Sequence, residues 1–163
     1  MNRGNTLQHL GTAVSLADAV SAYNEAIAVL ETLPLDAQPI YRNHLGAAWL
    51  NRGHALLVAS DAAGIASFEQ AITHLEKLPR ETGPYFLLNL VGARTNLANA
   101  LLSIEPPRAL AAARTALSEL APVERQHEAF AAMSLRARRA LVLAVGNLLL
   151  SGTGVPPVGL EKY

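Results

Sequence analysis

The sequence contains no cysteine, few aromatic residues and only two lysines, and these shortages exclude several classes of protein. Without cysteine there can be no disulfide, no thiolate nucleophile and no cysteine-based zinc site. Thirteen basic residues balance thirteen acidic ones, so no net charge attracts the chain to nucleic acid or to an anionic membrane. We therefore expect neither nucleic acid nor a membrane as a partner.

Long apolar runs are also missing. The first twenty residues include polar side chains and Asp18, where a secretory signal needs an unbroken apolar stretch. The most apolar segment, 140–150, is about half as long as a membrane-spanning helix and contains Asn147. We predict a buried helix there and a cytoplasmic protein. Eleven arginines against two lysines favour a GC-rich, bacterial coding sequence.

Helix-forming residues are abundant. Hydrophobic residues make up 51% of the chain and thirty residues are alanine, whereas aromatic residues reach only 5% and β-branched residues are scattered. Because alanine favours helix and the residues that favour strands are sparse, the composition predicts an all-α protein.

The apolar residues repeat with a period of about 45 residues. Within each copy they are spaced three, four and seven residues apart, which is one stripe of a helix. Pro34 and Pro79 end two copies, and Pro122 ends a third two residues early, because proline disfavours helical geometry in the residue before it. A shift of 45 superimposes Val20, Tyr23, Ala26, Ile27, Leu30 and Leu33 on Ile65, Phe68, Ala71, Ile72, Leu75 and Leu78.

Two helices form one unit, so the pattern predicts stacked antiparallel hairpins. The units span about 1–38, 39–83 and 84–124, and a capping helix over 125–150 completes a single domain, followed by a flexible tail at 151–163. The seven predicted helices span about 4–14, 16–33, 39–59, 61–78, 84–103, 107–121 and 125–150.

The segment AAWLNRGHAL resembles the first helix of a tetratricopeptide repeat, with Trp49, Asn51, Gly53 and Leu56 in the matching places. The segments with Tyr23-Ala26-Ile27 and Phe68-Ala71-Ile72 resemble the second helix of that family. The family's usual period is about 34 residues, so 45 implies a variant with longer helices, and HEAT or armadillo repeats have periods nearer this length. The resemblance implies a right-handed α-solenoid whose first helices line a concave binding groove.

The residues that we expect in this groove come from two first helices. From the second unit they are Leu50, Asn51, His54, Leu57 and Val58, and from the third they are Thr95, Asn96, Asn99 and Leu102. An asparagine amide can hydrogen-bond the backbone of an extended peptide. The alternatives are that Asn51 and Asn96 bond within the scaffold and that His54 is a surface histidine without a ligand.

A second candidate patch is the arginine cluster Arg136, Arg138 and Arg139, with Arg125 at the start of the same predicted helix. Guanidinium groups bind carboxylate or phosphate. The alternative is that Glu124, Glu128 and other acids pair with this face. The five histidines are spread over five segments without metal-binding spacing, so we expect no metal site and no cofactor.

No motif in the sequence supports a reaction, and we predict that the protein is not an enzyme. The function predicted first is a protein-interaction scaffold that binds a peptide or a partner helix in the groove. Relatives that bind chaperones hold a carboxylate with lysines on first helices, but Lys77 and Lys162 lie elsewhere, so we do not expect that activity.

The second prediction is self-association into a homo-oligomer through an unfinished fourth unit, which would leave Leu141, Val142, Val145, Leu148 and Leu149 partly bare. A small-molecule-binding or catalytic helical domain ranks third.

Overall fold

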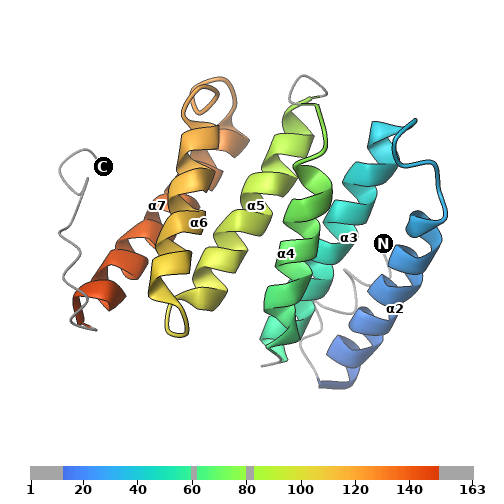
Figure 1. Cartoon of the computed structure of the whole chain (residues 1–163), viewed down its shortest axis with the longest axis horizontal. Coiled ribbons are helices and arrows are strands. Elements are labelled where there is room, and N and C mark those ends of the chain that lie inside the picture. Colours follow the sequence, from blue (N-terminus) through green and yellow to red (C-terminus); the bar gives the residue numbers. More distant parts are fainter. Residues whose placement is uncertain (1–12, 60–61, 80–82, 151–163) are drawn as a thin grey trace. The chain divides into compact units, whose positions relative to one another are not determined.

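The computed structural model describes residues 13–59, 62–79 and 83–150, and all regular structure in these ranges is α-helix (Figure 1). The helices are α2 (Ala13–Glu31), α3 (Pro39–Val58), α4 (Ala63–Leu75), α5 (Pro84–Leu101), α6 (Pro106–Leu120) and α7 (Glu128–Leu150). The prediction of an all-α fold is confirmed for the described residues.

The six predicted helices from 16–33 onward are all present, and each end lies within three residues of its predicted position. Helices α3, α5 and α6 begin at Pro39, Pro84 and Pro106. Proline suits the first helical position because the backbone N–H that it lacks would have no partner there. The predicted helix at 4–14, apart from its last two residues, which belong to α2, and the tail at 151–163 lie outside the described residues.

The chain divides into two compact units, residues 1–93 and residues 94–163, and the division falls within α5. It coincides with none of the predicted unit boundaries, and a single domain over 1–150 stays a prediction. We describe each compact unit by itself.

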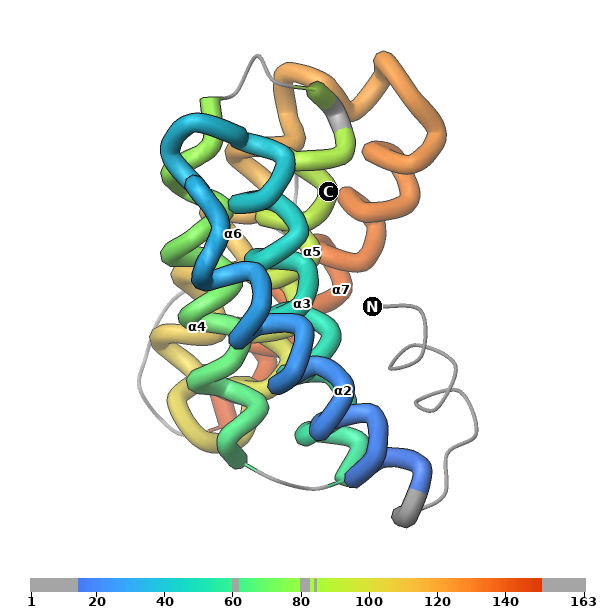
Figure 2. The backbone as a smooth tube through the Cα atoms, turned by 90° about the vertical axis from the view of Figure 1, so that its right-hand side faces the viewer, coloured from blue at the N-terminus to red at the C-terminus, as the bar shows by residue number. Residues whose placement is uncertain are grey.

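In the first compact unit, α3 packs against both α2 and α4 (Figure 2). Tyr23 of α2 is fully buried and clusters with Ala19 and with Ala55 of α3. A second cluster joins Ile27 of α2 to Leu45 and Ala48 of α3. The apolar stripe of α2 that was predicted from its spacing is therefore the side that α3 covers.

Helices α3 and α4 approach each other closely at two glycines. A Cβ atom on Gly53 would lie 2.6 Å from the Phe68 ring and 3.0 Å from the carbonyl oxygen of Gly64. A Cβ atom on Gly64 would lie 2.8 Å from the carbonyl oxygen of Gly53. Only glycine fits at such short distances between two backbones.

In the second compact unit, α6 packs against α7. The buried face of α6 is aliphatic and consists of Ala109, Leu110, Ala113, Ala116, Leu117 and Leu120. Polar contacts fasten the end of α5: Arg94 pairs with Glu119 of α6 at 3.0 Å, and the Asn147 amide of α7 donates to the carbonyl oxygen of Leu102 at 2.6 Å.

Burial follows the 45-residue period. Tyr23, Phe68 and Ala113 occupy one position of the repeat, and each is fully buried. Four residues further on, Ile27, Ile72 and Leu117 are also buried. The predicted register therefore matches the observed burial in α2, α4 and α6.

Candidate functional site

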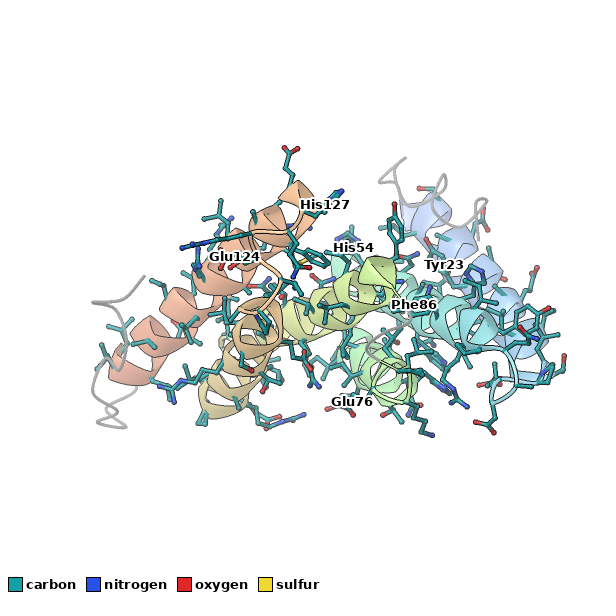
Figure 3. The ribbon with its side chains drawn as sticks, turned by 90° about the horizontal axis from the view of Figure 1, so that it is seen from above. Tyr23, His54, Glu76, Phe86, Glu124 and His127 are labelled. Atoms are coloured by element: carbon teal, nitrogen blue, oxygen red, sulfur yellow. The ribbon has the colours of Figure 1, made fainter. Side chains whose placement is uncertain are left out.

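One line of side chains along α3 is open to solvent. It consists of Ile40, His44, Asn51, His54 and Val58, which we call the α3 face. Four of the five are exposed and Asn51 is half-buried, whereas the small Ala47 on the same line is buried. Steps of three, four and seven residues keep these side chains on one side of the helix. The α3 face carries no charged residue, and Figure 3 labels His54 on it.

The predicted groove residues on α3 only partly coincide with this face. His54 and Val58 are exposed, and Leu50, Asn51 and Leu57 are half-buried. Leu57 is directed to α4, because its Cγ atom would lie 2.7 Å from a Cβ atom on Gly64. Sequence reasoning missed Ile40 and His44, although the same spacing extended toward the start of the helix would have included them.

The first half of α5 lies beside α3. The Asn89 amide donates to Oδ1 of Asn43 at 2.9 Å, and Asn43 is buried on α3. Tyr85, one turn before Asn89, is 75% exposed. Relative to the α3 face, Tyr85 and Asn89 occupy the positions of Ile40 and His44 one period later.

The second half of α5 belongs to the other compact unit and holds the remaining predicted groove residues. Asn99 is exposed, and Asn96 and Leu102 are half-buried. The prediction that Thr95 lies on an open face is wrong, because Thr95 is only 3% exposed. Thr95 precedes Asn96 by one residue, which turns its side chain about 100° around the helix toward the interior.

A network of polar contacts through Arg52 connects α3 to α2 and α4. The Arg52 guanidinium donates to Asn24 of α2 at 2.7 Å and to Ser67 of α4 at 2.5 Å. The same guanidinium lies 5.3 Å from the centre of the Trp49 ring. Arg52 therefore joins three helices and contributes a cation–π contact, which holds the α3 backbone and its open face in place.

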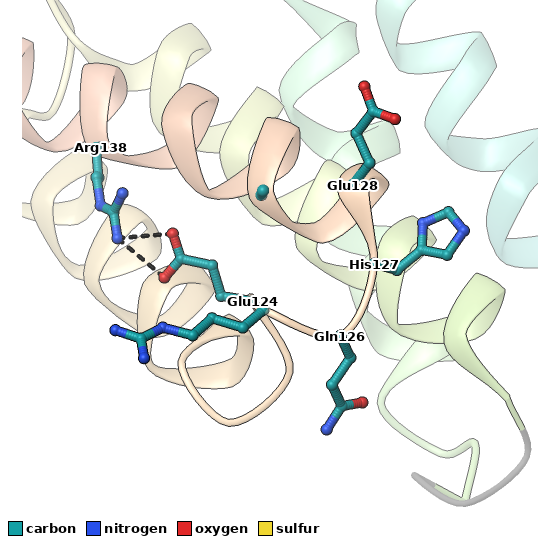
Figure 4. Close-up of a pocket in the computed structure, with 7 residues that line it drawn as sticks. Glu124, Gln126, His127, Glu128 and Arg138 are labelled. Atoms are coloured by element: carbon teal, nitrogen blue, oxygen red, sulfur yellow. Dashed lines mark hydrogen bonds and ion pairs between the residues drawn. The ribbon is translucent and has the colours of Figure 1, made fainter.

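The predicted arginine patch is divided. Arg138 pairs with both carboxylate oxygens of Glu124, at 2.8 and 2.9 Å (Figure 4), which agrees with the alternative that acids neutralise this face. Arg136 and Arg139 are exposed and form no ion pair with any residue that the structure describes. Arg125 lies in the turn before α7, because that helix begins at Glu128 and not at 125 as predicted.

The turn before α7 borders an open hollow of about 600 Å³, lined by Glu124, Arg125, Gln126, His127, Glu128, Ala131 and Arg138. Nδ1 of His127 accepts a hydrogen bond from the N–H of Ala129 at 3.1 Å and caps the helix. In Figure 4 the side chains of Gln126, His127 and Glu128 point away from the Glu124–Arg138 pair. The lining groups therefore do not converge on one point.

Two titratable groups, the buried Tyr23 and the half-buried His74, lie outside these surfaces. Burial raises the pKa of Tyr23 to about 12. Burial also lowers the pKa of His74, and the nearby charges of Lys77 and Arg42 lower it further, while Glu31 opposes them. Desolvation penalises the charged form of each side chain.

Among the residues that the structure describes, no three histidine, aspartate or glutamate side chains gather to hold a metal ion. None of the described helices is both long enough and apolar enough to cross a membrane. Comparison of the chain with protein-family models, with curated proteins and with solved structures found no match.

Proposed function

We propose that the protein is a helical-repeat interaction module of the tetratricopeptide type, which binds a peptide or a helix of another protein on the α3 face. The proposal includes the right-handed stacking of hairpins that the resemblance implies. The recurrence of burial every 45 residues and the close approach of helices at Gly53 support a repeat. The α3 face is the observation on which the choice of function rests.

The chemistry of the α3 face suits a peptide. Ile40 and Val58 offer aliphatic contacts at its two ends, and both are at least 42% exposed. Between them lie Asn51 and the two imidazoles of His44 and His54, polar side chains whose chemistry includes hydrogen-bond donors and acceptors. A surface of this kind binds apolar side chains and peptide groups, and it has no charge that would select an ionic ligand.

The dimensions of the α3 face fit a short segment. Eighteen residues separate Ile40 from Val58, which corresponds to about 27 Å along a helix. An extended peptide of about eight residues or a helix of about five turns covers this length. His44 and His54 are ten residues apart, about 15 Å, so they contact different parts of such a ligand and cannot act together on one atom.

A peptide array screened with the intact protein tests the proposal, with each hit measured again by isothermal titration calorimetry. We expect a peptide with two or more apolar residues to bind, and Val58→Glu to weaken it about tenfold or more because a buried apolar contact is lost. His54→Glu should also weaken binding. Ile104→Glu changes a side chain of similar exposure, 59% against 50% for Val58, outside the α3 face and is the matched control. An array without a binder, or Val58→Glu binding like the parent, contradicts the proposal.

A further inference from the structure

The side of α7 that faces solvent is unusually apolar. Leu135, Val142 and Leu149 recur every seven residues along it, Leu143 lies beside them, and Leu135 is 68% exposed. A stripe with a seven-residue repeat is the side that a helix presents to a second helix. We call these four residues with Arg136 and Arg139 the α7 face.

The α7 face differs from the stripe that the sequence predicted to be bare. Leu141, Val145 and Leu148 are buried against their own chain, at no more than 5% exposure. Only Val142 and Leu149 of the predicted stripe are exposed. An association surface on α7 therefore has to use the opposite side of the helix.

Charge divides the chain in a way that the net charge hides. Residues 1–93 contain eight acidic and five basic residues, and residues 94–163 contain five acidic and eight basic residues. The first compact unit is therefore negative by three charges and the second is positive by three. Arg136 and Arg139, which form no ion pair with the described part of the chain, place two of the positive charges on the α7 face.

An acidic surface of similar length lies on α2. Asp18, Ser21, Glu25 and Val29 lie along one exposed line of this helix and Thr32 lies in the turn that follows it, and we call these five residues the α2 face. Val29 is 63% exposed, and neither Asp18 nor Glu25 forms an ion pair with a described residue. Fourteen residues separate Asp18 from Thr32 and Leu135 from Leu149, about 21 Å in each case.

We propose that the α7 face of one copy of this chain docks on the α2 face of a second copy. With the two helices running in the same direction, the arginines of α7 meet Asp18 and Glu25, and the apolar half of α7 beyond Arg139 meets Val29. Each copy then neutralises charges on the other that form no ion pair with the described residues of their own chain.

A symmetrical pairing of α7 with α7 fits less well. An antiparallel pair centred on the middle of the helix places Arg136 and Arg139 of both copies close together, and like charges at short distance repel. Contact between two different faces leaves one α7 face and one α2 face free at the ends of every open assembly, and none free in a closed ring. It therefore produces chains or rings of copies, and not only dimers.

Light-scattering mass of the full chain, measured over a tenfold concentration range in 50 mM salt, tests the proposal. We expect the mass to rise with concentration, and to fall in 500 mM salt because screening weakens the charge pairs. The variants R136E/R139E and D18R/E25R should each weaken association at least tenfold. An equimolar mixture of the two should restore it, since each reversed face then meets a reversed partner. R108E/R114E makes the same charge change on α6 and should associate like the parent.

Three outcomes overturn the proposal. A mass that stays at one chain at every concentration means that a segment of the same chain or a different protein covers α7. If the D18R/E25R variant associates as strongly as the parent, α7 pairs with another surface. Association that neither reversal affects means that another interface is used. Circular dichroism shows whether each variant is folded. If a variant is unfolded, the salt series on the unaltered chain still tests whether charge pairs stabilise the association. The α3 face takes no part in this contact, so the peptide experiment and this one fail independently.

Discussion

His74 is a half-buried histidine whose surroundings disfavour the positively charged form of its ring. Its Nδ1 atom is buried and has no hydrogen-bond partner among the described residues. Burial lowers its pKa, and Lys77 and Arg42 add to the effect, whereas Glu31 opposes it. The neutral imidazole is therefore the form that the folded protein accommodates.

This lowered pKa makes stability depend on pH. The unfolded chain, with a histidine pKa near 6.5, binds more protons than the folded chain once the pH falls toward that value. The contribution of His74 to stability is thus complete above that pH and is lost as the pH falls toward the lowered pKa. We expect the urea midpoint of unfolding of the parent to decrease between pH 7 and pH 5. The midpoint of the His74→Gln variant should decrease less over the same range. Equal decreases in the two proteins would show that His74 does not control the effect.

Some single residues could be assigned from the sequence and others could not. Helix periodicity puts Val58 and His54 on one side of α3, and both are exposed. Thr95 was placed wrongly, since a difference of one residue separates an open side from a covered one. Glu124 could be named in advance as an acid near the arginine cluster, but its choice of Arg138, fourteen residues away, depends on a turn whose course no local pattern encodes.

At the level of elements, the contact between α3 and α4 depends on the missing side chain of Gly53. A methyl group there would overlap the Phe68 ring and touch the backbone of Gly64, which cannot move independently of α4. We expect Gly53→Ala to lower the free energy of unfolding by about 1–3 kcal/mol, because overpacking forces the two helices apart. Urea denaturation followed by circular dichroism measures the loss.

Gly146→Ala is the control for that experiment. Gly146 lies within α7, and a Cβ atom on it would meet nothing within 4 Å. Since alanine favours helix over glycine, this variant should gain about 0.5–1 kcal/mol. If both substitutions stabilise the protein, the close approach of α3 and α4 does not constrain position 53.

The helices themselves were predictable, but the surroundings of the last one were not. Proline positions and the 45-residue spacing give the ends of α3 and α6 within one residue. The start of α7 was predicted three residues early, because the side chain of His127 caps the helix and histidine is an uncommon cap. Which side of α7 is bare also escaped prediction, since a helix with apolar residues all round gives no local sign of the side that its neighbours cover.

On the scale of the whole molecule, the balance of thirteen acidic and thirteen basic residues conceals an uneven distribution of charge along the chain. A net charge of zero removes long-range attraction to polyanions, but it is compatible with two compact units of opposite charge. Counting charges separately in the two halves of the sequence would have shown this asymmetry. The boundary at residue 93 lies within α5, however, and no composition change marks it.

The repeat is the property of the whole chain that most invites a test. Repeat proteins gain stability from contacts between neighbouring units, so an added unit in register extends the fold. Residues 39–83 form one predicted unit that begins with the first residue of α3 and ends at Gly83, which has a positive φ of 132° before Pro84. Inserting a second copy of 39–83 after Gly83 retains a glycine–proline junction on both sides.

We expect the chain with this duplicated unit to fold, with a helical circular dichroism signal larger in proportion to the 45 added residues and a urea midpoint no lower than that of the parent. The control duplicates 48–83 and joins Gly83 to Ala48 in the middle of α3. That insertion breaks the 45-residue register, so the inserted half-helix cannot bury its apolar stripe and the midpoint should fall. If both insertions behave alike, the period of 45 residues is a pattern of the sequence and does not define a structural unit.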